Sequence, residues 1–137
     1  MSYAMAAALQ TAVYNRLRND AALNQLVDGA IYDTLPEGPV PPLYVVLGAE
    51  DVRDASDKTG TGAQHRFVIS VVTGRDGFST AKAAAGAISD ALVDADLTLS
   101  RGYLVALTFA KARAVRVGAG SLRQINLTFY ARVADDS

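Results

Sequence analysis

The sequence contains no cysteine and only one histidine, His65. The lack of cysteine excludes disulfide bonds and every metal site built from thiolates. Aromatic residues make up only 7% of the chain, although half of its residues are hydrophobic. Much of the apolar content is therefore alanine and valine, and side chains this small suit helices that press closely onto a sheet.

Long apolar runs and a strong net charge are also missing. No apolar run approaches the roughly 18 residues that a membrane-spanning helix needs. The apolar residues 1–9 lack the basic region of a signal peptide, because the first positive charge is Arg16. The formal net charge of -1 supplies no overall field that would attract nucleic acid or an anionic membrane. We therefore expect synthesis and assembly in the cytoplasm, and no membrane partner.

The clearest local pattern is a strand that leads into a helix, between His65 and Val93. Residues 67–72 alternate with the period of two that is typical of a strand, and residues 74–77 have the chemistry of a turn. The following helix has one apolar stripe with helical spacing. The residues of this stripe are Ala81, Ala84, Ala85, Ile88, Ala91 and Leu92. A length of 137 residues suits one domain, 1–137, built around this contact.

Two further helices, or one long helix with a kink near Asn19, are predicted near the amino terminus. Residues 2–18 carry apolar side chains four positions apart, which gives this segment one buried side. Asp20 is a good N-cap for a short second helix that runs through Val27, and Gly29 ends that helix.

Strands account for most of the remaining chain. The expected strands are 31–33, 43–52, 97–99, 103–109 and 125–133. A bulge is predicted near Ala110, because Lys111 and Arg113 fall on the parity of the preceding apolar residues. All four prolines lie between positions 36 and 42, so that segment is a rigid loop. The predicted fold class is α+β: a mostly antiparallel sheet packed on one face by two or three helices.

A polar, glycine-rich segment separates two of the expected strands, at residues 50–64. Its length and composition predict a long polar hairpin arm. Connections of this length between strands often bind a partner.

No combination of residues forms a convincing catalytic, cofactor or metal site. His65 could act as a general base with Glu50 and Asp51, but a lone histidine at the start of a strand is far more often structural. The sequence KTGTG at 58–62 reverses the order of a phosphate-binding loop. The spaced aspartates lack the central glycine and terminal glutamate of a calcium loop. We therefore expect no enzyme activity, no cofactor and no metal.

The carboxy-terminal hairpin is basic. Residues 103–133 contain five basic and no acidic side chains. The four candidates for a partner-facing surface, called here the basic hairpin, are Lys111, Arg113, Arg116 and Arg123. A nucleic-acid surface would need arginines on one face together with stacking aromatics, and only Tyr130 shares the exposed parity of Arg132. An acidic face on a protein neighbour fits better; DNA binding and a merely solvated face are the alternatives.

Taken in order, these features resemble the tail-terminator or tail-completion family of long-tailed phages, including the versions in gene-transfer-agent clusters. The resemblance covers nearly the whole chain. The segments that carry it are ALQTAVYNRL at 8–17, DAAL at 20–23, VDGAIYD at 27–33, PLYVVLG at 42–48, DKTG at 57–60, QHR at 64–66, the helix at 81–92, and Leu104, Val105 and Phe109.

The resemblance implies a structural virion protein that forms a ring, typically a homohexamer, on the head-proximal end of the tail tube. Such a ring stops tube growth and joins the tube to the neck, or head-completion, protein, while DNA passes through its lumen. The family brings no cofactor and no active site. We expect the arm to contact a neighbouring subunit or the tube; the residues chosen for this contact are Arg53, Asp54, Asp57, Lys58 and Thr59. The alternative function is a small DNA- or protein-binding module that uses the basic hairpin.

Overall fold

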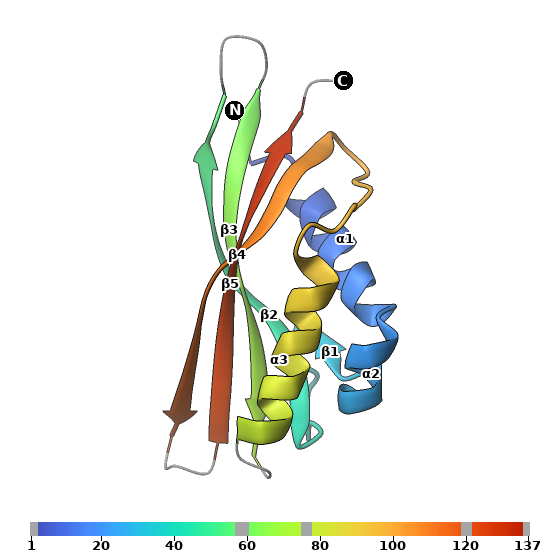
Figure 1. Ribbon diagram of the computed structural model, residues 1–137, viewed down its shortest axis with the longest axis vertical. Helices are drawn as coiled ribbons and strands as arrows, with labels where there is room; N and C mark the ends of the chain where they lie inside the picture. The colour runs from blue at the N-terminus through green and yellow to red at the C-terminus, as the bar shows by residue number, and fades with distance from the viewer. Residues whose placement is uncertain (1–2, 57–60, 75–77, 119–121, 136–137) are drawn as a thin grey trace.

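The computed structural model describes residues 3–56, 61–74, 78–118 and 122–135. The chain forms two layers, a twisted sheet and a layer of helices (Figure 1). The elements in chain order are α1 (Ala6–Arg18), α2 (Ala21–Val27), β1 (Ile31–Tyr32), β2 (Leu43–Asp54), β3 (Gly62–Thr73), α3 (Phe78–Leu92), β4 (Tyr103–Val117) and β5 (Leu122–Ala134). None of the helices described is long and apolar enough to cross a membrane.

The five strands form one sheet in the order β1-β2-β3-β5-β4. β1 runs parallel to β2, whereas the other three neighbouring pairs are antiparallel. The sheet is therefore mixed, and the single parallel pair departs from a purely antiparallel arrangement. β3 and β4 run in the same direction with β5 between them, and α3 connects them across one face. The predicted α+β class is confirmed.

The core lies between the helices and one face of the sheet. α3 buries the six residues of the predicted stripe, and β5 buries every second residue from Ile125 to Val133. Phe129 lies at the centre of this layer: its ring stacks on Phe67 with centroids 5.7 Å apart, and the ring of Phe109 meets it edge-on at 5.9 Å. Small side chains at Ala81, Ala84 and Ala91 let α3 approach the sheet closely.

The turn between α1 and α2 follows the sequence prediction. The Asp20 carboxylate accepts a hydrogen bond of 2.9 Å from the backbone N–H of Leu23, which makes Asp20 the N-cap of α2. The helix ends where Asp28 adopts a left-handed conformation with φ of 51°, and Gly29 follows with φ of 77°. α1 begins at Ala6, later than predicted.

The long hairpin arm is not confirmed. β2 and β3 continue their pairing as far as Asp54 and Ala63, so most of the polar segment belongs to the sheet. The connection between β2 and β3 therefore comprises residues 55–61 and not the predicted 50–64. Residues 57–60 lie outside the described residues. The base of the connection is closed by the backbone N–H of Ala55, which donates to the carbonyl of Gly62 at 2.9 Å.

β4 is longer than predicted and begins the carboxy-terminal hairpin. It runs on to Val117, and its pairing with β5 shifts register between Phe109 and Lys111, which confirms the bulge near Ala110. The predicted strand at 97–99 is wrong, because these residues belong to the irregular connection between α3 and β4. Leu99 is nevertheless buried there, as an apolar anchor of the connection.

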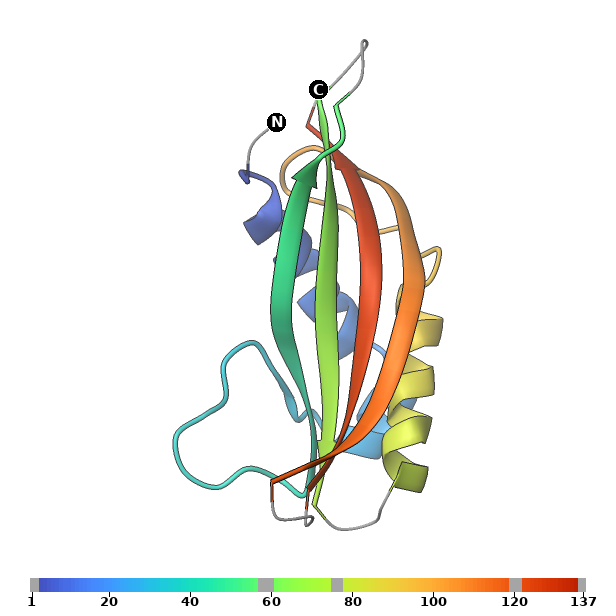
Figure 2. The same cartoon turned by 90° about the vertical axis from the view of Figure 1, so that its left-hand side faces the viewer.

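Both layers are visible in the view rotated by 90° (Figure 2). The sheet faces the viewer in that view and the helices lie behind it. The face turned away from the helices, called here the open face, is covered by no helix of the described residues. The side chains of the open face do not pack between the sheet and the helices, so core packing does not account for their composition.

Candidate interaction surface

The open face is formed by the residues of the central strands that alternate with the core. On β5 the residues that pack in the core are Ile125, Leu127, Phe129, Ala131 and Val133. The residues of the open face alternate with them, and they are Gln124, Asn126, Thr128, Tyr130 and Arg132. The register with the neighbouring strands extends this set. Arg66 on β3 pairs with Tyr130, and on β4 Lys111 pairs with Thr128 and Arg113 with Asn126.

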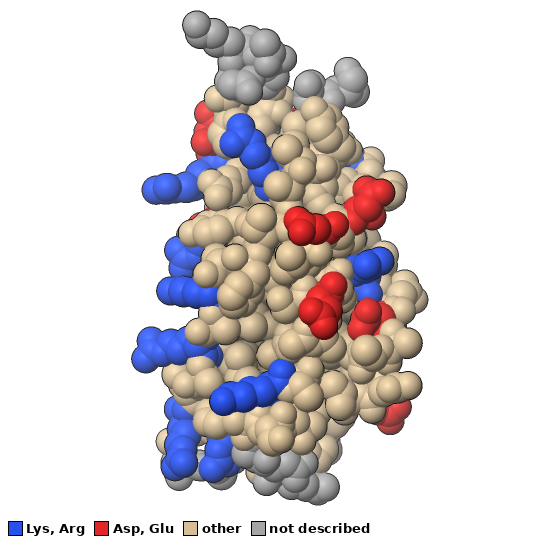
Figure 3. All heavy atoms as spheres, viewed as in Figure 1, with Lys and Arg blue, Asp and Glu red and all other residues tan. Residues whose placement is uncertain are grey.

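Positive charge gathers on the open face. Its basic side chains come from four strands; they are Arg53, Arg66, Lys111, Arg113 and Arg132. Figure 3 shows Lys and Arg along the margin of the molecule formed by the open face, whereas most of the Asp and Glu in that view lie over the helices. The near-zero net charge therefore conceals a separation between a basic sheet side and a more acidic helix side.

Two of these arginines already have partners. Arg66 lies 3.6 Å from the carboxylate of Asp51, with both side chains well exposed, so this pair adds little to stability. Arg132 donates a hydrogen bond of 3.0 Å to the carbonyl of Ala55 and so holds the base of the β2–β3 connection. A shallow hollow of about 530 Å³ lies beside them, between Arg53, Gln64 and Tyr130.

A polar row crosses the lower part of the open face. Ser70 donates a hydrogen bond of 2.7 Å to the side-chain carbonyl of Asn126, and Gln124 donates to the same oxygen at 2.7 Å. These amide and hydroxyl groups satisfy one another. The row therefore places hydrogen-bonded polar groups on this part of the open face.

The residues predicted for the arm have different environments. Arg53 and Asp54 are the last two residues of β2. The pKa of Asp54 is lowered, chiefly because the hydroxyl of Ser56 donates to its carboxylate at 2.7 Å. Asp54 therefore has a local structural role. Asp57, Lys58 and Thr59 lie outside the described residues.

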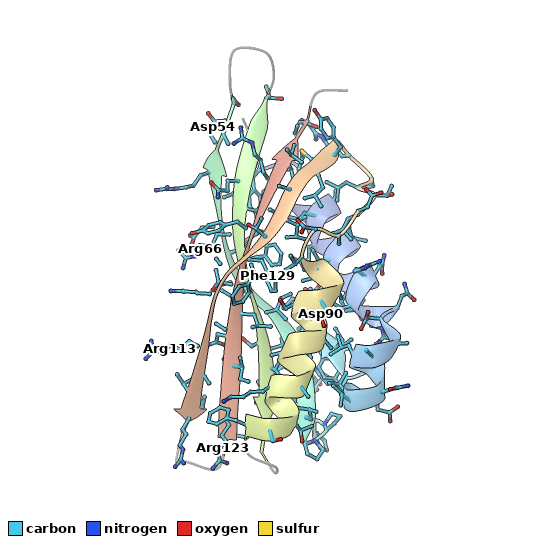
Figure 4. All side chains as sticks on the ribbon, viewed as in Figure 1. Asp54, Arg66, Asp90, Arg113, Arg123 and Phe129 are labelled. Carbon is cyan, nitrogen blue, oxygen red and sulfur yellow. The ribbon has the colours of Figure 1, made fainter. Side chains whose placement is uncertain are left out.

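The basic hairpin divides between the two sides of the sheet. Lys111 and Arg113 lie on the open face, whereas Arg116 and Arg123 form a cross-strand pair on the helix side. The guanidinium of Arg123 lies 5.8 Å from the ring centroid of Phe78, the first residue of α3. Figure 4 shows Arg66 and Arg113 directed away from the helices, and Arg123 at the end of the molecule where α3 begins. The four residues therefore do not form one continuous basic surface.

Arg53 and Arg66 were not grouped with Lys111 and Arg113 from the sequence. Arg132 was counted in the same acid-free segment but was not chosen as a partner-facing residue. Grouping them requires the strand order, because β5 is inserted between β3 and β4. The available signal was the alternation on β5 and on residues 64–72, which places Arg132 and Arg66 on exposed parities.

His65 is not accessible to a substrate. Its side chain is fully buried, and Nδ1 lies 3.6 Å from a carboxylate oxygen of Glu50, too far for a hydrogen bond. The hydroxyl of Tyr3 donates to that same carboxylate, and this hydrogen bond raises the pKa of Tyr3. Across the part of the chain that the structure describes, no three His, Asp or Glu side chains are grouped so that they could hold a metal ion.

The described residues thus combine a basic open face with a core that encloses the only histidine. The sequence matches the family "Tail completion protein gp17" over residues 11–134. The chain belongs to this family, which makes it a structural tail protein.

Solved structures agree with this assignment. A chain in a structure described as the virion of a native gene transfer agent particle is 62% identical and superposes with a TM-score of 0.92. The match covers 97% of this chain and 99% of that one. A second structure, only 16% identical, matches with a TM-score of 0.54 over the whole of this chain and 98% of its own, and shows the fold alone. A search of curated proteins finds no match.

Proposed function

We propose that this protein is a ring-forming tail terminator. It caps the head-proximal end of the tail tube, joins the tube to the neck, and lets DNA pass through its lumen. The observation that carries the proposal is the family match over residues 11–134 together with the 62% identical chain of a gene transfer agent virion. The ring is a homohexamer, assembled in the host cytoplasm and retained in the virion, and it needs no catalysis and no cofactor.

The geometry supports assembly through repeated contacts. A ring requires head-to-tail contacts, in which two different patches of each subunit meet. The described surface offers such different patches, because the open face is basic and the helix side is more acidic (Figure 3). The partners in this proposal are further copies of the chain, the tube protein and the neck protein.

The proposed contact residues keep the two groups predicted from sequence. Arg53, Asp54, Asp57, Lys58 and Thr59, at and beyond the end of β2, contact a neighbouring subunit or the tube. In the basic hairpin, Lys111 and Arg113 face an acidic partner from the open face. Arg116 and Arg123 reach a partner only at the helix side of the same hairpin.

Tube capping tests this function. The purified protein is added to polymerising tube protein, and tube lengths are measured by negative-stain electron microscopy, with native mass spectrometry of the protein alone. We expect closed rings of about six copies, and tubes that stop growing at one end. A variant with Asp57, Lys58 and Thr59 changed to alanine should keep its melting temperature and cap several-fold less well. Unchanged tube growth in the presence of the wild-type protein would overturn the proposal.

The second candidate function is a small DNA-binding module, and the five basic residues of the open face favour it. Direct binding to phosphates predicts an affinity that falls steeply with salt, with a slope close to the number of phosphates contacted. The affinity for a labelled DNA duplex is measured at several salt concentrations between about 50 and 300 mM. Its salt dependence separates the two candidate functions. A terminator ring should show weak DNA affinity while capping normally.

A further inference from the structure

β4 is an edge strand of the sheet. It pairs with β5 on one side, and no other strand among the described residues covers its second side. Of its 15 residues only Leu107 is buried. Tyr103, Val105 and Phe109 are 51%, 53% and 44% exposed. A long exposed edge that contains no proline is a template for pairing with another strand.

The opposite edge of the sheet is also open along half its length. β1 covers β2 only at Val45 and Val46. The following residues of β2, from Leu47 to Arg53, pair with β3 on one side, and no strand among the described residues lies on their other side. Within the described residues, backbone is therefore uncovered on both sides of the sheet: along β4 on one side, and along β2 beyond the end of β1 on the other.

The two open edges lie at the same height. Following the register across the sheet, Asp51 aligns with Arg66, Tyr130 and then Thr108. In the same way Arg53 aligns with Gln64, Arg132 and Ala106. Leu47, at the other end of the uncovered part of β2, aligns with Ile69, Leu127 and Ala112, so this part is level with residues 106–112 of β4.

The strand directions suit addition from copy to copy. Three antiparallel pairings separate β2 from β4, so the two strands run in opposite directions. Rotating a second copy about an axis along the strands keeps these directions, and brings its β2 beside β4 of the first copy as an antiparallel pair. The register shifts in β4 mark bulges, which curve a sheet as closure requires.

Charge favours this contact over the pairing of two β4 strands. β4 carries Lys111, Arg113 and Arg116 and no acid, whereas the uncovered part of β2, which is level with Lys111, carries Glu50, Asp51 and Arg53. Pairing β4 with β2 brings opposite charges together. Pairing β4 with β4 brings only basic side chains together across the junction, which destabilises a strand pair.

We propose that β4 of one copy adds to the uncovered part of β2 of the next copy, so that the sheets join into one continuous sheet around the ring. The occupant of the β4 edge is a second copy of this chain. The inference rests on the proposed ring, and it names the surfaces that build it. The open faces then form a continuous inner or outer wall lined by Arg53, Arg66, Lys111, Arg113 and Arg132.

The absence of cysteine from the chain permits a direct test by disulfide cross-linking. Asp51→Cys is combined in turn with Ala106→Cys, Thr108→Cys and Lys111→Cys, which lie along the open face of β4 and sample neighbouring registers. All four positions are exposed or on the edge, so the fold should tolerate them. The matched control combines Thr108→Cys with Asp90→Cys, an exposed position on α3 (Figure 4).

The variants are oxidised under conditions in which native mass spectrometry detects rings. At least one double variant should give a ladder of cross-linked species that ends at the ring size, at least tenfold more abundant than in the control. Each single variant should stay monomeric under denaturing conditions. Thr108→Cys alone tests β4–β4 pairing, and efficient dimers from it would overturn the proposal.

The outcomes separate this inference from the function. Rings without cross-links in any double variant overturn the edge pairing and leave the terminator intact. Cross-linked chains in a protein that neither closes into rings nor caps tubes support the pairing and overturn the terminator. The absence of cross-links, rings and capping together overturns both.

Discussion

His65 is a polar residue that occupies space in the core without exposure to solvent. The ring is fully buried on β3, and neither of its nitrogens makes a hydrogen bond within the described residues. A buried polar group without a partner lowers stability, because its hydration is lost without compensation. The enclosure also excludes the role of general base considered from the sequence.

We therefore predict that His65→Leu leaves the free energy of unfolding unchanged or raises it by about 1 kcal/mol. The leucine fills much of the same space and has no polar atoms to satisfy. His65→Ala should instead lower it by about 2–3 kcal/mol, because it leaves a cavity. Urea denaturation of both variants measures the difference, and a large loss of stability in His65→Leu would show that the imidazole makes a bond that matters.

A second residue-scale prediction concerns acid stability. Arg101 donates two hydrogen bonds, of 2.9 and 2.7 Å, to the carboxylate of Asp135, and they lower the pKa of that group. A carboxylate with a lowered pKa stabilises the folded state above its unfolded pKa of about 3.9, and this contribution is lost as the pH falls through the folded value. Asp135→Asn should therefore flatten the acid limb of the stability curve below about pH 4.

Thermal unfolding between acid and neutral pH checks this prediction. Arg101→Gln serves as the matched variant, because it removes the partner and keeps the carboxylate. Both single variants and the double variant should share one flattened curve, since they remove the same interaction. An acid limb as steep as that of the wild-type protein would show that the Arg101–Asp135 pair does not contribute to the pH dependence of stability.

Elements with one buried side were predictable from the sequence, and elements without one were not. The helix at 79–93 and the strand at 125–133 alternate cleanly between core and solvent, so their periods identified them. β4 is exposed on nearly every residue as an edge strand, and its pattern therefore broke down after Phe109. The ends of β2 and β3 looked like an arm because their open-face residues are polar while the backbone is still paired.

Gly102 is the last residue of the connection from α3 before β4 begins at Tyr103. Its φ is 66°, and a Cβ at this position would collide with the carbonyl oxygen of Ala134 and the side chain of Met5. Gly118 has a similar φ of 68° but open space around it. Substitutions at these two glycines therefore separate the free-energy cost of a left-handed backbone from the free-energy cost of a steric collision.

We predict that Gly102→Ala lowers the free energy of unfolding by more than about 3 kcal/mol, whereas Gly118→Ala lowers it by only about 1 kcal/mol. Both variants place an alanine in a left-handed backbone conformation. Only Gly102→Ala must also displace the carbonyl of Ala134, at the end of β5, and the buried side chain of Met5. Chemical denaturation monitored by circular dichroism compares them. Equal losses would mean that the start of β4 moves easily to make room.

At the scale of the whole molecule, the basic open face could not be predicted, because its five members come from four strands. Period-two alternation gives the parity of each residue, but only the strand order shows which parities share a face. The same order divided the basic hairpin, which sequence alone treats as one surface. Arg113 and Arg123 therefore provide a matched pair: the same residue type, on the same hairpin, on opposite sides of the sheet (Figure 4).

We predict that Arg113→Glu weakens ring assembly about tenfold at low salt, and that the deficit shrinks as salt rises, because screening weakens exposed charge contacts beyond about 10 Å. Arg123→Glu changes the net charge equally, but it acts at the α3 end of the helix side and should weaken assembly less than threefold, on the order of a rim contact. The protein concentration at half-maximal assembly, measured by sedimentation at several salt concentrations, gives both numbers. Equal effects of the two variants would mean that assembly responds to the total charge of the subunit, and that the open face has no special part in it.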